Sequence, residues 1–367
     1  PGGAFRGRVP GDPPGKGGRA MKSPFRRDGL GRAVVGALVL PGAGALLALA
    51  ACRWGPAFPA WAALGAAAAG AFLWWNLKPL PVRTRNPAPS SPDTGSLMHP
   101  DAAPLAQLKG HRDLLFCVHG FPATPADFRP FLPEADVLGY DLAAPLLPGC
   151  GTRPRDLAGQ DYDSFLHHVR SEYLRLRPRY ERVFLVGQSL GGTLALALAE
   201  EYCAVPALAP SALAAIGAPV VLNSLVRHGM VRHPLIYAAR FLGLFTACLG
   251  ARVPDPDREG EDGDERWLGY EGIYPRIVHT MQIRFPEVER KLRRVTCPVL
   301  VCHARGDRMT DYRNAAIIAG GVGSDRIETY TANMDRFRHI RHSLLLYDSQ
   351  RDRVRERILR FFGEFRS

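Results

Sequence analysis

The stretch Val183-Phe184-Leu185-Val186-Gly187-Gln188-Ser189-Leu190-Gly191-Gly192 decides the fold of this chain. Its four apolar residues predict a short buried strand, and the apolar run that continues to Tyr202 predicts a helix. Ser189 lies between them in a Gly-x-Ser-x-Gly pattern, which is typical of a sharp strand-to-helix turn that exposes a serine hydroxyl. Glycines at 187 and 191 keep side chains out of the crowded contact between strand and helix. Ser189 is therefore the candidate nucleophile.

Apolar runs of strand length alternate with helical patterns along the rest of the chain. Strands are expected at Leu114–Val118, Val137–Tyr140, Leu213–Ile216, Val299–Cys302 and Ile327–Thr331, and helices at Ser164–Arg177, Leu190–Tyr202 and Arg351–Phe362. This rhythm predicts an α/β fold, with a mostly parallel sheet covered by helices on both faces. The alternation breaks between Val220 and Glu289, which predicts a helical cap inserted at approximately 220–289.

A second motif, His119-Gly120-Phe121, follows the first predicted core strand. It resembles the oxyanion loop of the α/β-hydrolases, and this resemblance implies that the backbone N–H of Phe121 pairs with that of Leu190 to form an oxyanion hole. His119 itself is expected to be structural. It precedes Ser189, whereas the order in folds built on such a turn is nucleophile, acid and then base.

The acid and the base should therefore lie downstream of Ser189. Asp307 comes just past a late strand and is the expected acid, with Asp311 as its rival; the alternative role for Asp311 is a helix N-cap. His342 is the preferred base because an apolar run and the closing helix follow it directly. His339 is the alternative, since the loop that holds both histidines is long.

Together these motifs resemble the α/β-hydrolases, and in particular the small bacterial carboxylesterases related to monoacylglycerol lipase. The resemblance runs from about Leu114 to the C-terminus and rests on His119–Phe121, Pro145–Thr152, the Ser189 turn, Gly217–Pro219, Ala304–Asp307 and His342. The sequence departs from the family pattern at two positions. Cys150 stands where the family usually has histidine, and Arg341 precedes His342 where the family usually has glycine.

The resemblance implies an α/β-hydrolase fold and cleavage of a small acyl ester or lipid-derived substrate. Ser189 would form an acyl-enzyme, His342 would act as its base, and Asp307 would orient the imidazole, without a metal or organic cofactor. Acyl transfer or thioester cleavage would use the same residues. A non-catalytic binding module on a hydrolase scaffold is a third interpretation, which the intact Ser, Asp and His set argues against.

The net charge of +12 is concentrated ahead of the folded body. Residues 1–100 carry 12 Lys and Arg against 3 Asp and Glu, and the remaining 267 residues carry 35 against 32. The body therefore lacks the basic stripe that nucleic-acid binding needs, and no nucleic-acid partner is expected. Residues 1–32 are expected to form a disordered basic N-terminus, with Met21 as an alternative start of the chain.

Two uncharged apolar runs, Ala33–Cys52 and Pro56–Leu77, are each long enough to cross a bilayer. They predict two transmembrane helices, a hairpin at 33–77, followed by a Pro-rich linker at 78–106 and a hydrolase domain at 107–367. Lys and Arg residues flank the outer ends of the hairpin, so the positive-inside rule places the catalytic domain on the cytoplasmic side of the cytoplasmic membrane. Buried Ala-rich core helices are one alternative. A lipoprotein anchored at Cys52, suggested by Leu49-Ala50-Ala51-Cys52, is the other.

Overall fold

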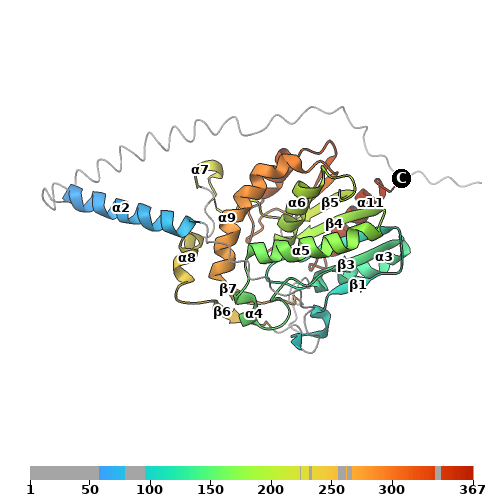
Figure 1. Cartoon of the computed structure of the whole chain (residues 1–367), viewed down its shortest axis with the longest axis horizontal. Coiled ribbons are helices and arrows are strands. Elements are labelled where there is room, and N and C mark those ends of the chain that lie inside the picture. The colour runs from blue at the N-terminus through green and yellow to red at the C-terminus, as the bar shows by residue number, and fades with distance from the viewer. Residues whose placement is uncertain are drawn as a thin grey trace, which may run out of the picture. The chain divides into compact units, whose positions relative to one another are not determined.

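The protein is built around one seven-stranded sheet. The computed structural model describes residues 58–78, 96–223, 225–230, 234–254, 262, 267–334 and 340–366. The strands follow the spatial order β1-β3-β2-β4-β5-β8-β9 (Figure 1). Their bounds are β1 Leu105–Gln107, β2 Asp113–Val118, β3 Tyr140–Ala144, β4 Arg182–Gln188, β5 Ala212–Ile216, β8 Val299–Ala304 and β9 Ile327–Ala332. β1 pairs antiparallel with β3, and the other neighbouring pairs are parallel, which confirms the predicted sheet.

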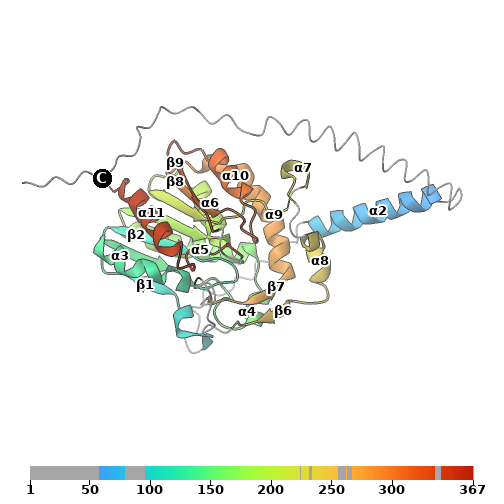
Figure 2. The same cartoon turned by 180° about the vertical axis from the view of Figure 1, so that it is seen from behind.

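Helices cover both faces of this sheet (Figures 1 and 2). One face carries α5 Tyr162–Leu176, α6 Leu190–Tyr202, α9 Pro275–Lys291 and α10 Arg313–Gly321, and the other carries α3 Leu132–Val137 and α11 Arg351–Gly363. Strand residues alternate between the two layers, as the period of two requires. Leu114 and Phe116 of β2 belong to the first core, whereas Leu115 and Cys117 belong to the second.

Short elements complete the connections between these layers. They are the 3₁₀ turns η3 Pro100–Ala102, η4 Pro125–Phe131, η5 Arg177–Arg179 and η8 Leu292–Arg294, together with the helix α4 Pro154–Ala158.

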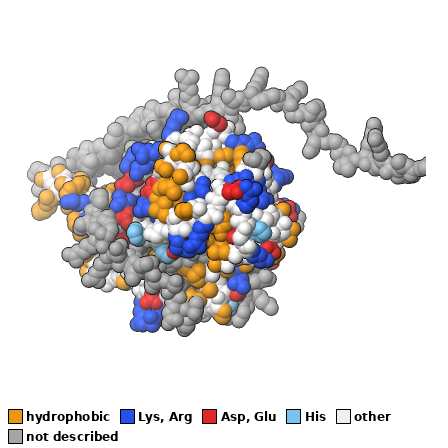
Figure 3. Space-filling model, turned by 45° about the vertical axis from the view of Figure 1, so that its right-hand side comes forward, with side chains coloured by type: hydrophobic (Ala, Val, Ile, Leu, Met, Phe, Trp, Pro, Cys, Tyr) orange, Lys and Arg blue, Asp and Glu red, His pale blue; other side chains and the backbone are white. Residues whose placement is uncertain are grey.

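On the face drawn in Figure 3, Lys and Arg side chains are intermixed with Asp, Glu and apolar side chains.

The strand expected at Val137–Tyr140 begins only at Tyr140, so this part of the prediction is wrong. Val137 is instead the last residue of α3 and its side chain is 85% exposed. Gly139 follows with a φ of 74°, a left-handed conformation that commonly ends a helix. The apolar pair Val137-Leu138 thus lies at the exposed end of a helix, although its composition is that of a strand.

The segment between β5 and α9 departs from the strand–helix alternation. It contains α7 Leu225–His228, η6 Pro234–Ala238 and α8 Ala239–Leu242, followed by an antiparallel hairpin of β6 Leu249–Arg252 and β7 Glu271–Ile273. The sequence indicated helices here but not the hairpin. α9 lies within the predicted cap range of 220–289, yet it packs against α5 and α6 in the layer that covers the sheet.

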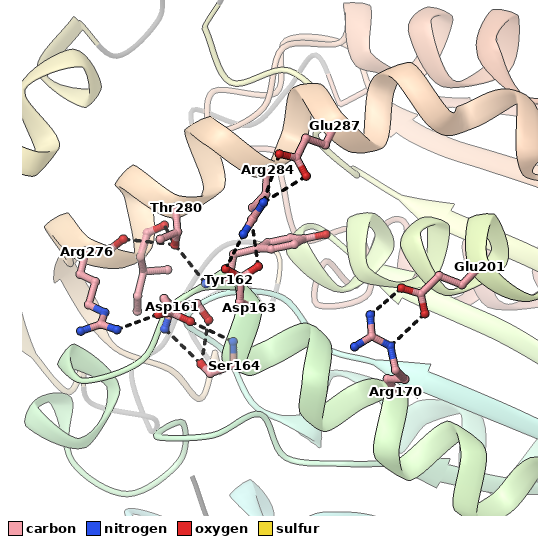
Figure 4. Close-up of polar contacts among 11 residues, drawn as sticks. Asp161, Tyr162, Asp163, Ser164, Arg170, Glu201, Arg276, Thr280, Arg284 and Glu287 are labelled. Carbon is pink, nitrogen blue, oxygen red and sulfur yellow. Dashed lines mark hydrogen bonds and ion pairs between the residues drawn. The ribbon is translucent and has the colours of Figure 1, made fainter. Parts of the chain in front are cut away.

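Polar contacts fasten α9 to the beginning of α5 (Figure 4). Arg284 of α9 forms a bidentate ion pair with Asp163, in which Nε and Nη2 donate to the two carboxylate oxygens at 2.9 and 3.0 Å. Arg276 donates to Asp161 at 2.8 Å, and the N–H of Tyr162 donates to Thr280 at 3.0 Å. This set fixes the helix that ends the inserted segment against the body of the protein.

The chain divides into two compact units, residues 1–70 and 71–367. The helix α2 spans Phe58–Leu77, and its part from Ala60 to Leu77 is long and apolar enough to cross a membrane. Only 6% of that part is buried, and it is the one helix of this kind among the residues described. The first predicted span, Ala33–Cys52, lies outside the described residues, as do residues 1–32 and most of the predicted linker.

The turn around Ser189 is packed too tightly to admit side chains. A Cβ atom on Gly191 would lie 1.9 Å from the carbonyl oxygen of Val118, at the end of β2. A Cβ on Gly187 would lie 2.4 Å from the carbonyl oxygen of Gly191. Backbone atoms on both sides leave no flexible side chain to move away, so glycine is required at both positions.

Replacing Gly191 with alanine should therefore destabilise the protein by about 3 kcal/mol or more, because the new methyl group must push β2 away from α6. Urea denaturation followed by circular dichroism measures this change. Gly320→Ala in α10 is the matched control. A Cβ there meets no atom within 4 Å, so the variant should be neutral or more stable by up to about 1 kcal/mol. Equal denaturation midpoints for the two variants would contradict the tight contact described here.

Candidate active site

Ser189 lies at the C-terminal end of β4, immediately before α6. Its backbone has φ 55° and ψ −124°, a strained conformation for any residue other than glycine. The N–H of Ser189 donates to the carbonyl of Ile216 in the neighbouring strand at 2.7 Å, which holds the turn in place. The strain thus serves to project the hydroxyl beyond the edge of the sheet.

The structure brings the three predicted site residues together. His342 Nε2 lies 2.6 Å from Ser189 Oγ, and His342 Nδ1 lies 2.8 Å from Asp307 Oδ2. Ser189 follows β4, Asp307 follows β8, and His342 stands on the loop before α11, so three separate connections converge at the same edge of the sheet. All three side chains are at least nine-tenths buried.

Asp307 is held as a carboxylate by several donors. Its Oδ1 accepts the N–H groups of Met309 and Thr310 at 2.8 and 2.9 Å. Burial opposes ionisation of Asp307, but the facing His342 imidazole and the hydrogen bonds from His303 and His342 outweigh it. Together they hold the pKa of Asp307 well below its usual range. The carboxylate therefore stays charged and can orient the imidazole across the ordinary pH range.

His303 is a member of this site that sequence reasoning missed. It belongs to β8, is fully buried, and places Nε2 at 3.2 Å from Asp307 Oδ2. The hydroxyl of Thr310 reaches the same carboxylate oxygen at 3.0 Å. The available signal was the spacing, since His303 precedes Asp307 by four residues, but the expected strand ended at Cys302, whereas β8 continues to Ala304.

The structure describes only one of the two alternative site residues, Asp311 as the acid and His339 as the base. Asp311 accepts the N–H of Arg313 at 2.9 Å and forms an ion pair with the Arg313 guanidinium at 2.9 Å. Asp311 thus lies one residue before Tyr312, the N-cap of α10, so the N-cap position predicted for it is off by one residue, while Asp307 faces His342. His339, the rival base, lies outside the described residues.

Arg341 accounts for one departure from the family pattern. Its φ is 58°, in the left-handed region that favours glycine. The position before His342 thus needs a positive φ, and arginine adopts it here at a cost of about 1 kcal/mol. The guanidinium packs over the Asp307 turn, because a Cβ on Gly306 would come within 2.8 Å of Arg341 Nη1.

The predicted oxyanion amides lie beside Ser189. Leu190 is the first residue of α6, so its N–H has no acceptor within the helix and adds to the positive end of the helix dipole. The loop that holds Phe121 approaches from β2, since a Cβ on Gly120 would lie 3.0 Å from Ser189 Cβ. This arrangement can offer two N–H donors to an oxygen that becomes negatively charged at the serine.

His119 fixes the loop that carries Phe121. Its Nδ1 donates to the carbonyl of Gly120 at 2.8 Å, and its Nε2 accepts the N–H of Leu147 at 2.9 Å. Burial lowers the pKa of His119 to about 4, so the ring is neutral and can make both contacts. These contacts are structural, as the sequence predicted for this histidine.

The sequence and the fold are similar to those of known hydrolases. Residues 115–357 match the model of the alpha/beta hydrolase family. The chain belongs to the alpha/beta hydrolase family. It is similar to a thermostable monoacylglycerol lipase of Bacillus sp. (strain H-257), with 28% identity over 247 residues that cover 67% of this chain and 89% of that protein.

Solved structures of alpha/beta hydrolases share this fold. A metagenome-derived lipolytic enzyme superposes with a TM-score of 0.59 and 24% identity, covering 72% of this chain and 98% of that one. The monoacylglycerol lipase of Paleococcus ferrophilus gives a TM-score of 0.57 and 16% identity, covering 71% and 98%. The predicted α/β-hydrolase fold of residues 107–367, the predicted resemblance and the predicted enzyme class, a serine ester hydrolase, are confirmed.

A second buried carboxyl group, Asp127, stands near this alpha/beta hydrolase site and was also missed. Gln188, the residue before the nucleophile, donates to Asp127 Oδ2 at 2.7 Å and accepts the N–H of Leu345 at 3.3 Å. Asp127 Oδ1 has no partner among the described residues. Burial, opposed by the Gln188 hydrogen bond and the charge of His342, raises the pKa of Asp127 to about 7.

Within the described part of the chain, no group of three or more His, Cys, Asp or Glu side chains is placed to hold a metal ion.

In the Asp127→Asn variant, the free energy of unfolding should fall less between low and high pH than it does in the wild type. An aspartate with a pKa near 4 when unfolded and about 7 when folded stabilises the folded state most at low pH. That contribution is lost as the pH rises through the interval between the two values. Asparagine keeps an acceptor for Gln188 and does not ionise. Urea denaturation at pH 5 and pH 8 should show that the variant loses less stability than the wild type, by on the order of 1–3 kcal/mol. Parallel losses in the two proteins would show that Asp127 does not titrate in this interval.

Proposed function

We propose that this chain hydrolyses carboxylic esters through Ser189, His342 and Asp307, as a carboxylesterase or monoacylglycerol-lipase-like enzyme. The observation that carries the proposal is the continuous run of contacts from Ser189 Oγ to His342 and on to Asp307, at 2.6 and 2.8 Å. Its order along the chain and its place at the carboxyl edge of the sheet are those of a hydrolytic triad.

The reaction follows from the positions of these atoms. His342 Nε2 takes the hydroxyl proton of Ser189 while the serine oxygen bonds to the ester carbonyl carbon. The carbonyl oxygen becomes an oxyanion that accepts the N–H groups of Phe121 and Leu190. When the intermediate collapses, the alcohol leaves with the proton from His342. Water then attacks the acyl carbon and gives one proton to His342. When this second intermediate collapses, the bond from the acyl carbon to Ser189 Oγ breaks, His342 returns the proton to Oγ, and the carboxylic acid leaves. Asp307 orients the imidazole and stabilises its cationic form.

An acyl group of lipid origin suits the surroundings of the oxyanion loop. The ring of Phe121 lies 5.7 Å from that of Tyr274 and 6.4 Å from that of Phe165, measured between centroids. Phe165 and Tyr274 are fully buried, so their rings support the ring of Phe121, which follows Gly120 beside Ser189. The names of the similar lipases support the same substrate class, a monoacylglycerol or a related ester.

We also propose that the enzyme is tethered to the cytoplasmic membrane, with the hydrolase domain on the cytoplasmic side. The length and composition of α2 support a spanning helix, and the uncharged run Ala33–Cys52 supports a second one. Lys and Arg residues before Ala33 and after Leu77 support the orientation. A tethered enzyme would meet esters that concentrate in the bilayer.

Ser189→Ala and His342→Ala should each reduce the hydrolysis of p-nitrophenyl esters by about 10⁴-fold or more, because each removes one member of a unit that acts together. A fluorophosphonate probe should label the wild-type protein at Ser189 and should not label the alanine variant. Circular dichroism should be unchanged in both variants.

His339→Ala is the matched control for the base and should retain nearly full activity. The reverse pattern, with an active His342→Ala and an inactive His339→Ala, would transfer the role of base to His339. Labelling by the probe at another serine would contradict the nucleophile assignment.

Membrane fractionation tests the tether. After a carbonate wash the full chain should stay in the membrane pellet, because two apolar helices remain in the hydrocarbon. Deleting residues 1–70, which leaves the second compact unit, should move the protein to the supernatant. Alkaline phosphatase fused to the C-terminus should be inactive in a bacterial host. An active fusion, together with acylation of Cys52, would favour the lipoprotein topology instead.

A further inference from the structure

The inserted segment between β5 and α9 exposes large apolar side chains close together. Five of them make up the apolar cap surface: Phe241, Leu244, Phe245, Leu249 and Ile273. Leu244 and Phe245 are 65% and 74% exposed, at the end of α8. Single exposed apolar residues are ordinary, but a cluster marks a surface that meets a partner.

The members of this surface form two pairs. The rings of Phe241 and Phe245 lie 5.1 Å apart, between centroids. Leu249 and Ile273 are paired across the β6–β7 hairpin, which follows α8 in the chain. The inserted segment therefore exposes an aromatic pair around α8 and an aliphatic pair on the hairpin.

The end of α2 is joined to the same surface. Asn76 Oδ1 accepts the N–H of Phe241 at 2.9 Å, and Asn76 is almost completely buried. Arg240 donates to the carbonyl of Trp75 at 2.9 Å and lies over its ring, while Phe72 meets Phe241 edge to face. Both views of the chain show α8 beside the end of α2 (Figures 1 and 2). These contacts all lie within the unit 71–367.

The charges around this joint suit a lipid headgroup region. Residues 225–254 contain four arginines and neither Asp nor Glu. Glu289 and Glu271 neutralise Arg227 and Arg252. Of the other two, Arg232 lies outside the described residues and Arg240 lies at the joint itself. Lys78 lies 5.0 Å from the ring of the exposed Trp74. Tryptophan beside Lys or Arg is typical of the level where hydrocarbon meets headgroups.

We propose that the end of α2 and the apolar cap surface form one membrane-facing joint, which holds the cap against the surface of a bilayer that contains anionic lipid. The inference rests on the proposed function, in which α2 is the anchor. A bilayer is favoured over a second copy of the chain because the surface is continuous with an apolar helix long enough to span a membrane. Cations and tryptophan border the surface, as they do at a membrane interface.

The hairpin that carries part of the apolar cap surface is bonded to the loop that holds Phe121. Directly before β7, the N–H of Tyr270 donates to the carbonyl of Pro122 at 3.0 Å. Pro122 follows Phe121, whose N–H belongs to the proposed oxyanion hole. A bilayer-embedded ester would thus be taken up next to the segment that carries the oxyanion amide.

The full chain in phosphatidylcholine–phosphatidylglycerol vesicles tests this joint. The cap variant is Leu244→Glu with Phe245→Glu. Its matched control is Val137→Glu with Leu138→Glu, which alters two adjacent exposed apolar residues on the body. The cap variant should lose about tenfold or more in its rate on a monoacylglycerol dissolved in the vesicles, through a higher apparent KM. Its rate on a water-soluble p-nitrophenyl ester should stay within about twofold. The control should change neither rate.

Equal losses on both substrates, or no loss on the vesicle substrate, would overturn the joint. A second measurement does not depend on catalysis: a phospholipid with a photoreactive acyl chain should label the peptide around 241–252 of the Ser189→Ala variant. Labelling confined to α2, or cross-links between two copies of the chain at this peptide, would also overturn it. If the wild type hydrolysed neither ester while the lipid still labelled the cap, the proposed function would fail and the joint would stand.

Discussion

The contact between the Ser189 turn and the end of β2 constrains the rest of the structure. Gly191 packs so close to the carbonyl of Val118 that the first turn of α6 is pressed against the neighbouring strand. That closeness puts the start of α6 and the loop after β2 beside the same hydroxyl, so the amides of Leu190 and Phe121 can serve one oxygen. The strained backbone of Ser189 is stable only because β4, β5 and α6 hold it from three sides.

Two buried carboxyl groups near the site show that hydrogen bonds and facing charges, together with burial, determine whether a carboxyl group is ionised. Asp307 and Asp127 are equally inaccessible, and burial alone would neutralise both. For Asp307, burial is outweighed by the facing His342 imidazole and by hydrogen bonds from His303 and His342, so its pKa falls. For Asp127, burial outweighs the single Gln188 hydrogen bond and the charge of His342, so its pKa rises to about 7. The protein thus keeps one carboxyl charged to orient His342, while burial makes the second one harder to ionise.

The sequence predicted the sheet and three converging site residues because each belongs to a local pattern. Ser189 is marked by its glycines, Asp307 by the end of a late strand, and His342 by the last helix. Residues whose role depends on distant neighbours escaped prediction. His303 matters only because β8 carries it alongside Asp307, and Asp127 only because η4 brings it to Gln188. The hairpin β6–β7 escaped because its strands are 3 or 4 residues long and nearly 20 residues apart.

The inserted segment between β5 and α9 contacts two parts of the protein that are far apart in the sequence, the end of α2 and the loop that carries Phe121. At one end α8 is bonded to Trp75 and Asn76 of α2, and at the other end Tyr270 is bonded to the loop that carries Phe121. A single stretch of chain therefore runs from the proposed anchor to the proposed oxyanion hole. In this arrangement the sheet holds the nucleophile and the acid, while the inserted segment contacts both the end of α2 and the loop that carries Phe121.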